Sequence, residues 1–234
     1  MVTKSIYHAF TEALNLKTRL LAVLVDPDKF EAAEAPHFLR SLPTETTHIF
    51  VGGSTVPDGT TESLVNALKL VTSKPIILFP GDHSQITNAA DGLLFLSLLS
   101  GRNPEYLVGQ QVLSVPVLRN CTLEVIPTGY LLIDGGNQSA VARVTQTSAM
   151  SQQSFSDIVD TAKAGELMGA RLIYLEAGSG ARIPVSAEII SEVKKEISIP
   201  LIVGGGIKTE TQRIKAYEAG ADMVVMGTAF ELNQ

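Results

Sequence analysis

Short apolar runs recur along this chain, with segments of helical periodicity between them. Eight such runs can be counted, and most are continuously apolar and rich in β-branched residues. Strands that are buried on both faces of a parallel sheet have this pattern. Eight strands alternating with helices predict a closed (β/α)₈ barrel, with a doubly wound open sheet as the alternative. The predicted strands are 20–25, 47–51, 75–79, 92–97, 123–126 extending to 130–133, 172–175, 201–203 and 223–226.

One connection is too short for a full strand–helix unit. Only residues 80–91 separate the third and fourth predicted strands, and they include Pro80, Gly81 and Asp82. We therefore predict a modified TIM barrel in which the helix between strands 3 and 4 is reduced or replaced by loop. The gap could form a groove for an elongated ligand, or a short helical turn could cover it. The predicted helices are 5–14, which covers the barrel bottom, and 31–41, 61–73, 104–114, 138–147, 154–168, 186–196 and 209–219.

Length and composition limit the class of protein and its partners. A chain of 234 residues without a linker predicts a single TIM-barrel domain over 1–234. The net charge of −6 argues against a nucleic-acid partner, which requires clustered Lys and Arg. No apolar run reaches the roughly 18 residues of a membrane span, so we expect no stable membrane insertion. The single cysteine, Cys121, excludes an internal disulfide, and a cytoplasmic protein is expected.

Two late segments predict a phosphate-binding site. Residues 201–207 and 223–229 each run from an apolar strand into glycine, and Gly205 and Gly227 are 22 positions apart, about one strand–helix unit. In barrels of this type, the ends of the last two strands present backbone N–H groups and helix N-termini to a phosphate. This predicts an enzyme that acts on a phosphorylated small molecule.

The first two predicted strands end in residues that can bind a metal ion. Asp26 ends the first strand, and Gly52-Gly53-Ser54 closes the second. A carboxylate at this place can hold Mg²⁺, which commonly bridges to substrate phosphates, and Ser54 can offer a hydroxyl. The alternative is a pair of ordinary turns, with Asp28 as a helix cap. Lys29 is either a diphosphate contact or a solvated cation.

The sixth predicted strand closes with the sequence Tyr174-Leu175-Glu176-Ala177-Gly178-Ser179-Gly180. Glu176 is expected at the barrel mouth, where a carboxylate can act as general base toward a substrate hydroxyl. The glycine-rich end can form a backbone nest around an anion, and Tyr174 can donate its phenol. The alternative places Tyr174 in the core and Glu176 in a salt bridge at the rim.

These segments occur in one order that resembles a known family. Residues 25–29, 51–54, 127–130, 174–180, 203–207 and 227–228 together resemble the geranylgeranylglyceryl phosphate synthase family, which includes the bacterial heptaprenylglyceryl phosphate synthases. The resemblance covers nearly the whole chain, and the Tyr-Leu-Glu-Ala-Gly-Ser-Gly stretch is its most specific part. Members have a modified barrel whose third helix is replaced by loop, which agrees with the short connection described above.

The resemblance implies a Mg²⁺-dependent prenyltransferase of ether-lipid biosynthesis. Such an enzyme joins sn-glycerol 1-phosphate to a polyprenyl diphosphate, with geranylgeranyl diphosphate the favoured donor, and releases diphosphate. The resemblance assigns Mg²⁺ to Asp26 and Ser54 and the proton-accepting role to Glu176. It assigns the glycerol phosphate site to Tyr174, Leu175, Glu176, Ala177, Gly178, Ser179, Gly180, Gly205, Gly206, Gly227 and Thr228.

The resemblance also bears on the donor groove and on assembly. The prenyl chain is expected in an apolar groove near the short connection, with Leu94, Leu96 and Leu98 as nearby residues. The chain contains no tryptophan, so no indole can limit the groove, and this slightly favours longer donors. Because members are commonly dimers or hexamers, a homo-oligomer is expected.

Two other classes of function are alternatives. An isomerase or aldolase on a phosphate-binding barrel would usually require a Schiff-base lysine or a second acid at a strand end. Lys208 follows the seventh strand beyond the glycines, which is a poor position for a buried amine. A non-catalytic module that binds glycerol phosphate or lipid would not require Asp26 and Glu176 together.

Overall fold

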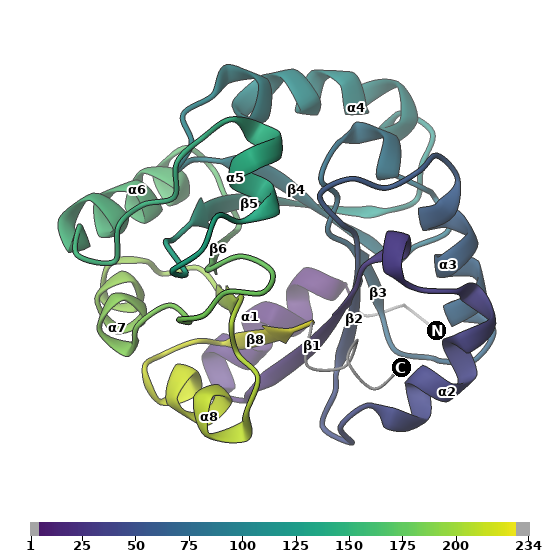
Figure 1. Cartoon of the computed structure of the whole chain (residues 1–234), viewed down its shortest axis with the longest axis horizontal. Coiled ribbons are helices and arrows are strands. Elements are labelled where there is room, and N and C mark those ends of the chain that lie inside the picture. The colour runs from purple at the N-terminus through teal and green to yellow at the C-terminus, as the bar shows by residue number, and fades with distance from the viewer. Residues whose placement is uncertain (1–4, 228–234) are drawn as a thin grey trace.

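The computed structural model describes residues 5–227 of the chain. Eight parallel strands close into a barrel in sequence order, with β8 paired to β1 (Figure 1). The closed barrel is therefore confirmed, the open sheet is wrong, and each strand ends within one residue of its predicted limits. The strands are β1 (Leu20–Val25), β2 (His48–Val51), β3 (Ile76–Leu78), β4 (Gly92–Leu98), β5 (Glu124–Leu132), β6 (Leu172–Glu176), β7 (Leu201–Gly204) and β8 (Met223–Met226).

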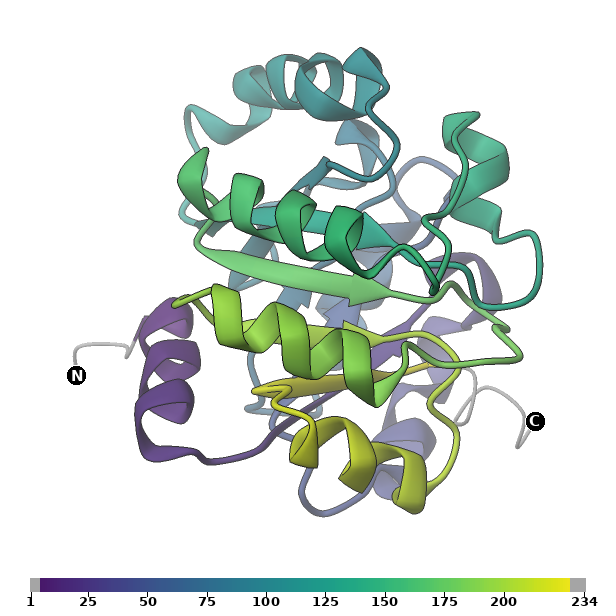
Figure 2. The same cartoon turned by 90° about the vertical axis from the view of Figure 1, so that its left-hand side faces the viewer.

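Helices surround the sheet and cover one end of it. Figure 2 shows α1 at the end where the strands begin and α5 at the end where they finish. The helices are α1 (Ile6–Leu16), α2 (Ala35–Ser41), α3 (Thr60–Lys69), α4 (Gln110–Leu118), α5 (Ala140–Thr145), α6 (Phe155–Leu167), α7 (Ala187–Glu196) and α8 (Glu210–Glu218), with short 3₁₀ segments η1 (Pro27–Lys29), η2 (Ala32–Glu34) and η3 (His83–Gln85) and a π-helical turn, η4 (Glu105–Gly109). None of the helices in residues 5–227 is long and apolar enough to cross a membrane.

The connection between β3 and β4 contains only the three-residue segment η3. The prediction of a reduced helix at this place is confirmed, and the outer ring in Figure 1 has no full helix between α3 and α4. Side chains of the connection bind the neighbouring loop, because the Gln85 amide donates to the Gly53 carbonyl at 2.8 Å. The short connection therefore forms part of the rim at the strand ends.

The helix observed where one was predicted over 104–114 has different limits. It begins as the turn η4 and continues as α4 to Leu118, through Pro116. A proline within a helix removes one hydrogen bond to the carbonyl four residues earlier. The carbonyl that would accept this bond belongs to Val112, a residue that is 62% exposed.

The core consists of a barrel interior and two outer layers. In the interior, Phe10 from α1 packs with Phe50, Tyr174 and Ile202. Outside the sheet, one layer packs α6 and α7 against the strands, and another packs α2 and α3. The closed, packed interior fixes the strand ends, which carry the loops of the site described next.

Candidate active site

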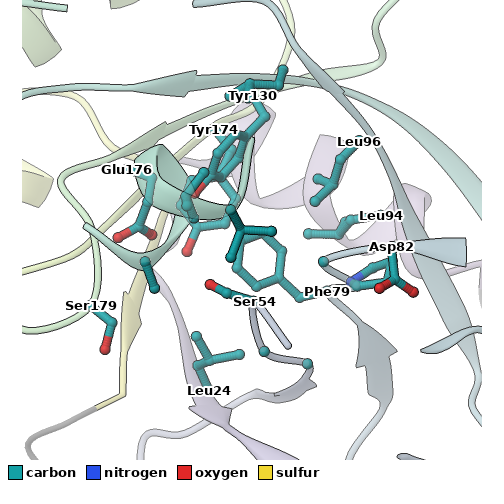
Figure 3. A pocket seen from close by; sticks show the side chains of 18 of the residues that line it. Leu24, Ser54, Phe79, Asp82, Leu94, Leu96, Tyr130, Tyr174, Glu176 and Ser179 are labelled. Atoms are coloured by element: carbon teal, nitrogen blue, oxygen red, sulfur yellow. The ribbon is translucent and has the colours of Figure 1, made fainter. Parts of the chain in front are cut away.

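A cavity opens at the C-terminal ends of the strands and has a volume of about 1480 Å³, open mouth included (Figure 3). Loops from around the barrel line it together with residues of α4 and α5. The structure brings most of the predicted site residues together here, at the end where barrel enzymes bind their substrates. These lining residues are Asp26, Ser54, Tyr174, Glu176, Gly178, Ser179, Gly205, Gly206 and Gly227.

Three predicted residues are placed elsewhere, and a fourth is outside the part of the chain that the structure describes. Leu175 and Ala177 are buried in the layer between the sheet and the helices, and the Ala177 N–H donates to the Gly204 carbonyl at 3.0 Å. Gly180 is not among the residues that line the cavity. Thr228 lies outside the described residues. The side chain of Leu175 points away because alternate residues of a strand face opposite sides of the sheet.

Glu176 ends β6 and is only 6% exposed. Its Oε1 accepts the Gly178 N–H at 2.7 Å. Burial raises the pKa of Glu176 to about 7, although the bond from Gly178 and the adjacent Tyr174 hydroxyl oppose that shift. Within residues 5–227, no lysine or arginine forms an ion pair with this carboxylate, so the salt-bridge alternative is wrong. A carboxyl with a pKa near neutrality is suited to accept a proton.

The Tyr174 ring lies in the barrel interior, and its hydroxyl is at the cavity. The side chain is fully buried, and its hydroxyl has no hydrogen-bond partner among the described residues. Burial and the nearby Glu176 carboxylate both raise the pKa of Tyr174, so the phenol remains protonated. The prediction that Tyr174 packs in the core is confirmed, whereas donation of its hydroxyl to a ligand stays a prediction.

The glycines after β7 allow the backbone to pass directly beside Glu176. Gly205 and Gly206 have φ angles of 79° and 71°, a region that favours glycine. A Cβ on Gly205 would lie 2.3 Å from Glu176 Oε1 and 2.6 Å from the Gly178 nitrogen. Two glycine-containing loops therefore meet at the carboxylate, and their backbone can approach a ligand closely.

On the other side of the mouth, Asp26 and Ser54 follow β1 and β2. Asp26 accepts the Asp28 N–H at 3.2 Å and forms an ion pair with Lys29 at 2.9 Å. Asp26 therefore caps the turn η1, and the capping role considered for Asp28 is not observed. A Cβ on Gly53 would lie 2.4 Å from Asp26 Oδ1, so the two loops are in direct contact.

The oxygen atoms of Asp26 and Ser54 fit a Mg²⁺ ion that takes its remaining ligands from water and substrate. No group of three or more His, Cys, Asp or Glu residues within 5–227 is arranged to hold a metal ion. One carboxylate and one hydroxyl cannot form a cage made only of protein ligands. Mg²⁺ commonly binds through one or two carboxylates together with water and substrate phosphates, and the residues present fit that arrangement.

The remaining wall of the cavity is largely apolar. Leu94, Leu96 and Leu98 of β4 line it, as do Val141 and Val144 of α5. The cavity therefore combines a polar part near Glu176 and Asp26 with an apolar part near β4 and α5. An amphipathic ligand with a charged head and a long apolar tail matches this division.

Sequence reasoning missed several lining residues, of which Phe79, Asp82 and Tyr106 are the clearest. Phe79 was predicted as the last residue of the third strand and directly follows β3 in the structure, so its place at a strand end was the available signal. Tyr106 comes from the π-helical turn, which sequence periodicity does not predict. Lys208 also lines the cavity but is exposed, so it does not provide the buried amine that a Schiff-base aldolase needs.

The fold and the cavity define a (β/α)₈ barrel whose strand ends carry a buried carboxyl with a raised pKa, glycine-rich loops and a largely apolar wall, an arrangement typical of an enzyme. The sequence matches the PcrB family over residues 15–234. A relative from Zunongwangia profunda, named geranylgeranylglyceryl phosphate synthase, is 57% identical over 226 residues, which are 97% of each chain. A relative of the same name from Flavobacterium johnsoniae is 50% identical, over 98% of this chain and 95% of its own length.

A solved structure agrees with these relatives. The crystal structure of (S)-3-O-geranylgeranylglyceryl phosphate synthase from Thermoplasma acidophilum, in complex with its substrate sn-glycerol-1-phosphate, has a TM-score of 0.90 to this fold. It is 33% identical, and the match covers 99% of this chain and 93% of that one. The chain therefore belongs to the PcrB family and is a prenyltransferase of the geranylgeranylglyceryl phosphate synthase type.

Proposed function

We propose that this enzyme joins sn-glycerol 1-phosphate to a polyprenyl diphosphate, forming a prenylglyceryl phosphate ether and diphosphate. The observation that carries the proposal is the Glu176 carboxyl, which is buried at the cavity with a pKa of about 7 and without an ion-pair partner among residues 5–227. Relatives at 57% and 50% identity bear the name of this activity, and the Thermoplasma acidophilum enzyme binds sn-glycerol-1-phosphate.

The acceptor is proposed to bind beside Glu176. Backbone N–H groups of the loops at Gly178, Gly205 and Gly227 surround the phosphate, and the Tyr174 hydroxyl donates to the acceptor. This arrangement places the free hydroxyl of the glycerol near the carboxylate. It also gives the Tyr174 hydroxyl, which adjoins the Glu176 carboxylate but forms no hydrogen bond of ordinary geometry within residues 5–227, a well-placed acceptor.

The donor is proposed to bind with its diphosphate near Asp26, Lys29 and Ser54 and its tail along the leucines of β4. All of these residues line the same cavity. We propose geranylgeranyl diphosphate as the donor, because the relatives are named for that chain length. Donors of other lengths are therefore part of the test below.

Mg²⁺ is proposed to be held by Asp26 and Ser54 together with the diphosphate. When bound, it compensates the negative charge on the departing diphosphate. Lys29 pairs with Asp26 and contributes a further positive charge at the same side of the cavity. Metal binding is therefore expected to depend on the donor, since the protein supplies few ligands.

The residues of this chain account for the proton and the bonds in the proposed reaction. The bond between the allylic carbon and the diphosphate oxygen breaks, and its electron pair leaves with diphosphate. A lone pair of the glycerol hydroxyl forms the new ether bond, and its proton passes to Glu176. The loops hold the two reacting ends in one cavity, which converts binding into orientation.

The test measures diphosphate release with prenyl diphosphates of several lengths, with and without Mg²⁺. Acceptors are sn-glycerol 1-phosphate and, as the matched control, sn-glycerol 3-phosphate. The proposal expects Mg²⁺-dependent turnover confined to the 1-phosphate and fastest with the C20 donor. Absence of turnover with every donor would contradict the proposed reaction, while a faster longer donor would correct only the chain length.

We also propose that the enzyme acts in the cytoplasm and as a homo-oligomer. The sequence has a single cysteine, as is common in reducing compartments.

Apolar residues are exposed on η4 and α4, and α4 carries no charge that could attract lipid phosphates, so a second copy of the chain fits this face. Light scattering of Val112→Glu should show smaller particles than the wild type, whereas Leu167→Glu, on α6, should not. Equal particle sizes for all three would contradict this face.

A further inference from the structure

The cavity wall contains an aromatic cluster in which only the Tyr174 hydroxyl, and none of the ring faces, has a role in the proposed reaction. The Phe79 ring stacks on the Tyr174 ring at 5.1 Å between centroids and lies 5.8 Å from the Tyr130 ring. All three residues line the cavity. Figure 3 shows Phe79 in the middle of the site, with Glu176 on one side and Asp82 on the other. The ring is therefore near the region where donor and acceptor must meet.

The position of Phe79 is fixed by the sheet and not by a flexible loop. Its N–H donates to the Val51 carbonyl at 2.8 Å, which continues the pairing of β2 and β3. A Cβ on Gly52 would lie 1.8 Å from the Phe79 carbonyl oxygen, so the two backbones are in close contact. A group that is already in place needs no rearrangement when charge develops beside it, which is the condition for effective electrostatic catalysis.

The proposed reaction creates a positive charge that needs such a group. When the bond to diphosphate breaks, positive charge spreads over the allylic carbons of the donor. Lys29 would repel this charge, and Glu176 has to remain free to take the hydroxyl proton. The face of an aromatic ring attracts a cation through its quadrupole, and it does not form a covalent bond that would stop the reaction.

We infer that the Phe79 ring stabilises the allylic cation as diphosphate departs, which makes Phe79 a catalytic residue as well as part of the groove. This inference rests on the proposed function. The Tyr174 ring supports Phe79 from one face by stacking. The three rings also keep water away from the cation, which would otherwise be captured as the free prenyl alcohol.

The test changes the electrons of the ring while keeping its shape. Phe79 is replaced by phenylalanine carrying one, two or three fluorines, which weakens the quadrupole stepwise with little change in volume. We expect kcat to fall stepwise, by about thirtyfold over the series, which is the loss of a desolvated cation–π contact. The dissociation constant of a non-reacting prenyl thiodiphosphate should remain within about twofold, because that ligand carries no cation.

Phe50 provides the matched control. Its ring lies 6.4 Å from the Phe79 ring and is fully buried, but it does not line the cavity. The same fluorine series at Phe50 should leave kcat unchanged. A flat kcat series at Phe79, or an equal decline at Phe50 and Phe79, would overturn the inference.

Replacement of Phe79 by another standard amino acid gives a second test. Phe79→Leu keeps an apolar side chain and should lower kcat about thirtyfold, with release of some prenyl alcohol in place of ether. Wild-type turnover is measured first, so that the two proposals can fail separately. Turnover with a flat series overturns only the role of Phe79, and absence of wild-type turnover overturns both.

Discussion

The two ends of the barrel use their polar groups differently. At the N-terminal end, the Glu124 carboxylate accepts hydrogen bonds from the Ser5 hydroxyl and from the N–H groups of Ile6 and Tyr7, at 2.5, 2.6 and 3.0 Å. One carboxylate thus satisfies the first N–H groups of α1 and fixes that helix across the barrel. His48 lies at the same end, buried and packed 5.3 Å from the Phe10 ring.

The groups at the C-terminal end are less completely satisfied than Glu124, although the N-terminal end also has one buried oxygen without a partner among the described residues, Thr46 Oγ1. The Tyr174 hydroxyl has no partner among residues 5–227, and burial raises the pKa of Glu176 to about 7. Buried polar groups without partners reduce stability, so their presence usually indicates a ligand or a catalytic role. The comparison indicates that Glu124 stabilises the fold at the N-terminal end, whereas Glu176 and Tyr174 at the C-terminal end serve function at a cost in stability.

The largest expected effect that tests this difference is that of Glu176→Gln. Loss of the proton acceptor should lower kcat by about a thousandfold. The same change should raise the free energy of unfolding at pH 8 by about 3 kcal/mol, because the folded-state pKa of about 7 exceeds the ordinary 4.5. Stability from the protonated carboxyl is present below pH 4.5 and is lost as pH rises through 7. Urea unfolding and turnover at pH 8 measure both, and a less stable variant would contradict the account.

Tyr174→Phe should have the next largest effect. We expect kcat/KM for sn-glycerol 1-phosphate to fall about ten- to a hundredfold, the range for one hydrogen bond to a charged group. The free energy of unfolding should change little, since the hydroxyl forms no hydrogen bond of ordinary geometry within residues 5–227 and only adjoins the Glu176 carboxylate. Initial rates and urea unfolding check the two effects separately. A variant with full activity and reduced stability would show that the hydroxyl is structural.

Glu124→Gln should show the reverse pattern at the opposite end. The amide has only one acceptor oxygen, so some of the three bonds to α1 are lost, and the free energy of unfolding should fall by about 1–3 kcal/mol. The value of kcat should remain that of the wild type. Chemical denaturation and initial rates under the same buffer conditions test this. A loss of kcat without a loss of stability would contradict the structural role assigned to the N-terminal end.

The smallest effect is expected from His48. Its contribution to the free energy of unfolding should depend on pH in the opposite direction to that of Glu176. Burial, with a smaller effect of Lys74, lowers the pKa of His48 to about 4. Because the unfolded state takes up the proton more readily, the His48 contribution to stability should fall by about 2 kcal/mol as pH is lowered from 7 to 5, which offsets the gain from Glu176 over the same range. His48→Gln should therefore gain stability on acidification, while Glu176→Gln should lose it. Thermal or urea unfolding at several pH values distinguishes the two, and an unchanged acid response in His48→Gln would contradict the assignment.

The sequence predicted the strands well, because strands buried on both faces are marked by continuous apolar runs. Each of the eight runs became a strand, and the twelve-residue connection over 80–91 was too short for a helix, as expected. The helix limits were less predictable. A proline usually ends or kinks a helix, but α4 continues through Pro116 to Leu118 and exposes several of its apolar residues.

The site was predictable where one segment carries several functional groups. Residues 174–180 contain the carboxyl, the phenol and the glycines in one stretch, and most of them line the cavity. Phe79 was not found in this way, because its role depends on rings from β5 and β6. Glu124 was missed for a similar reason, since its partners at α1 are 117 to 119 residues away in the sequence. Contacts of this kind exist only once the barrel has closed.

The central claim is that Glu176 is the proton acceptor, and that its burial sets its pKa. The most direct measurement is the pH dependence of kcat/KM for sn-glycerol 1-phosphate in the wild type and in Glu176→Asp, with donor and Mg²⁺ saturating. The account predicts a rise with pH through one ionisation near 7 in the wild type, and a displaced midpoint in the variant, because the shorter side chain meets a different environment. A wild-type profile that is flat between pH 5 and 9, or the same midpoint in both proteins, would contradict it.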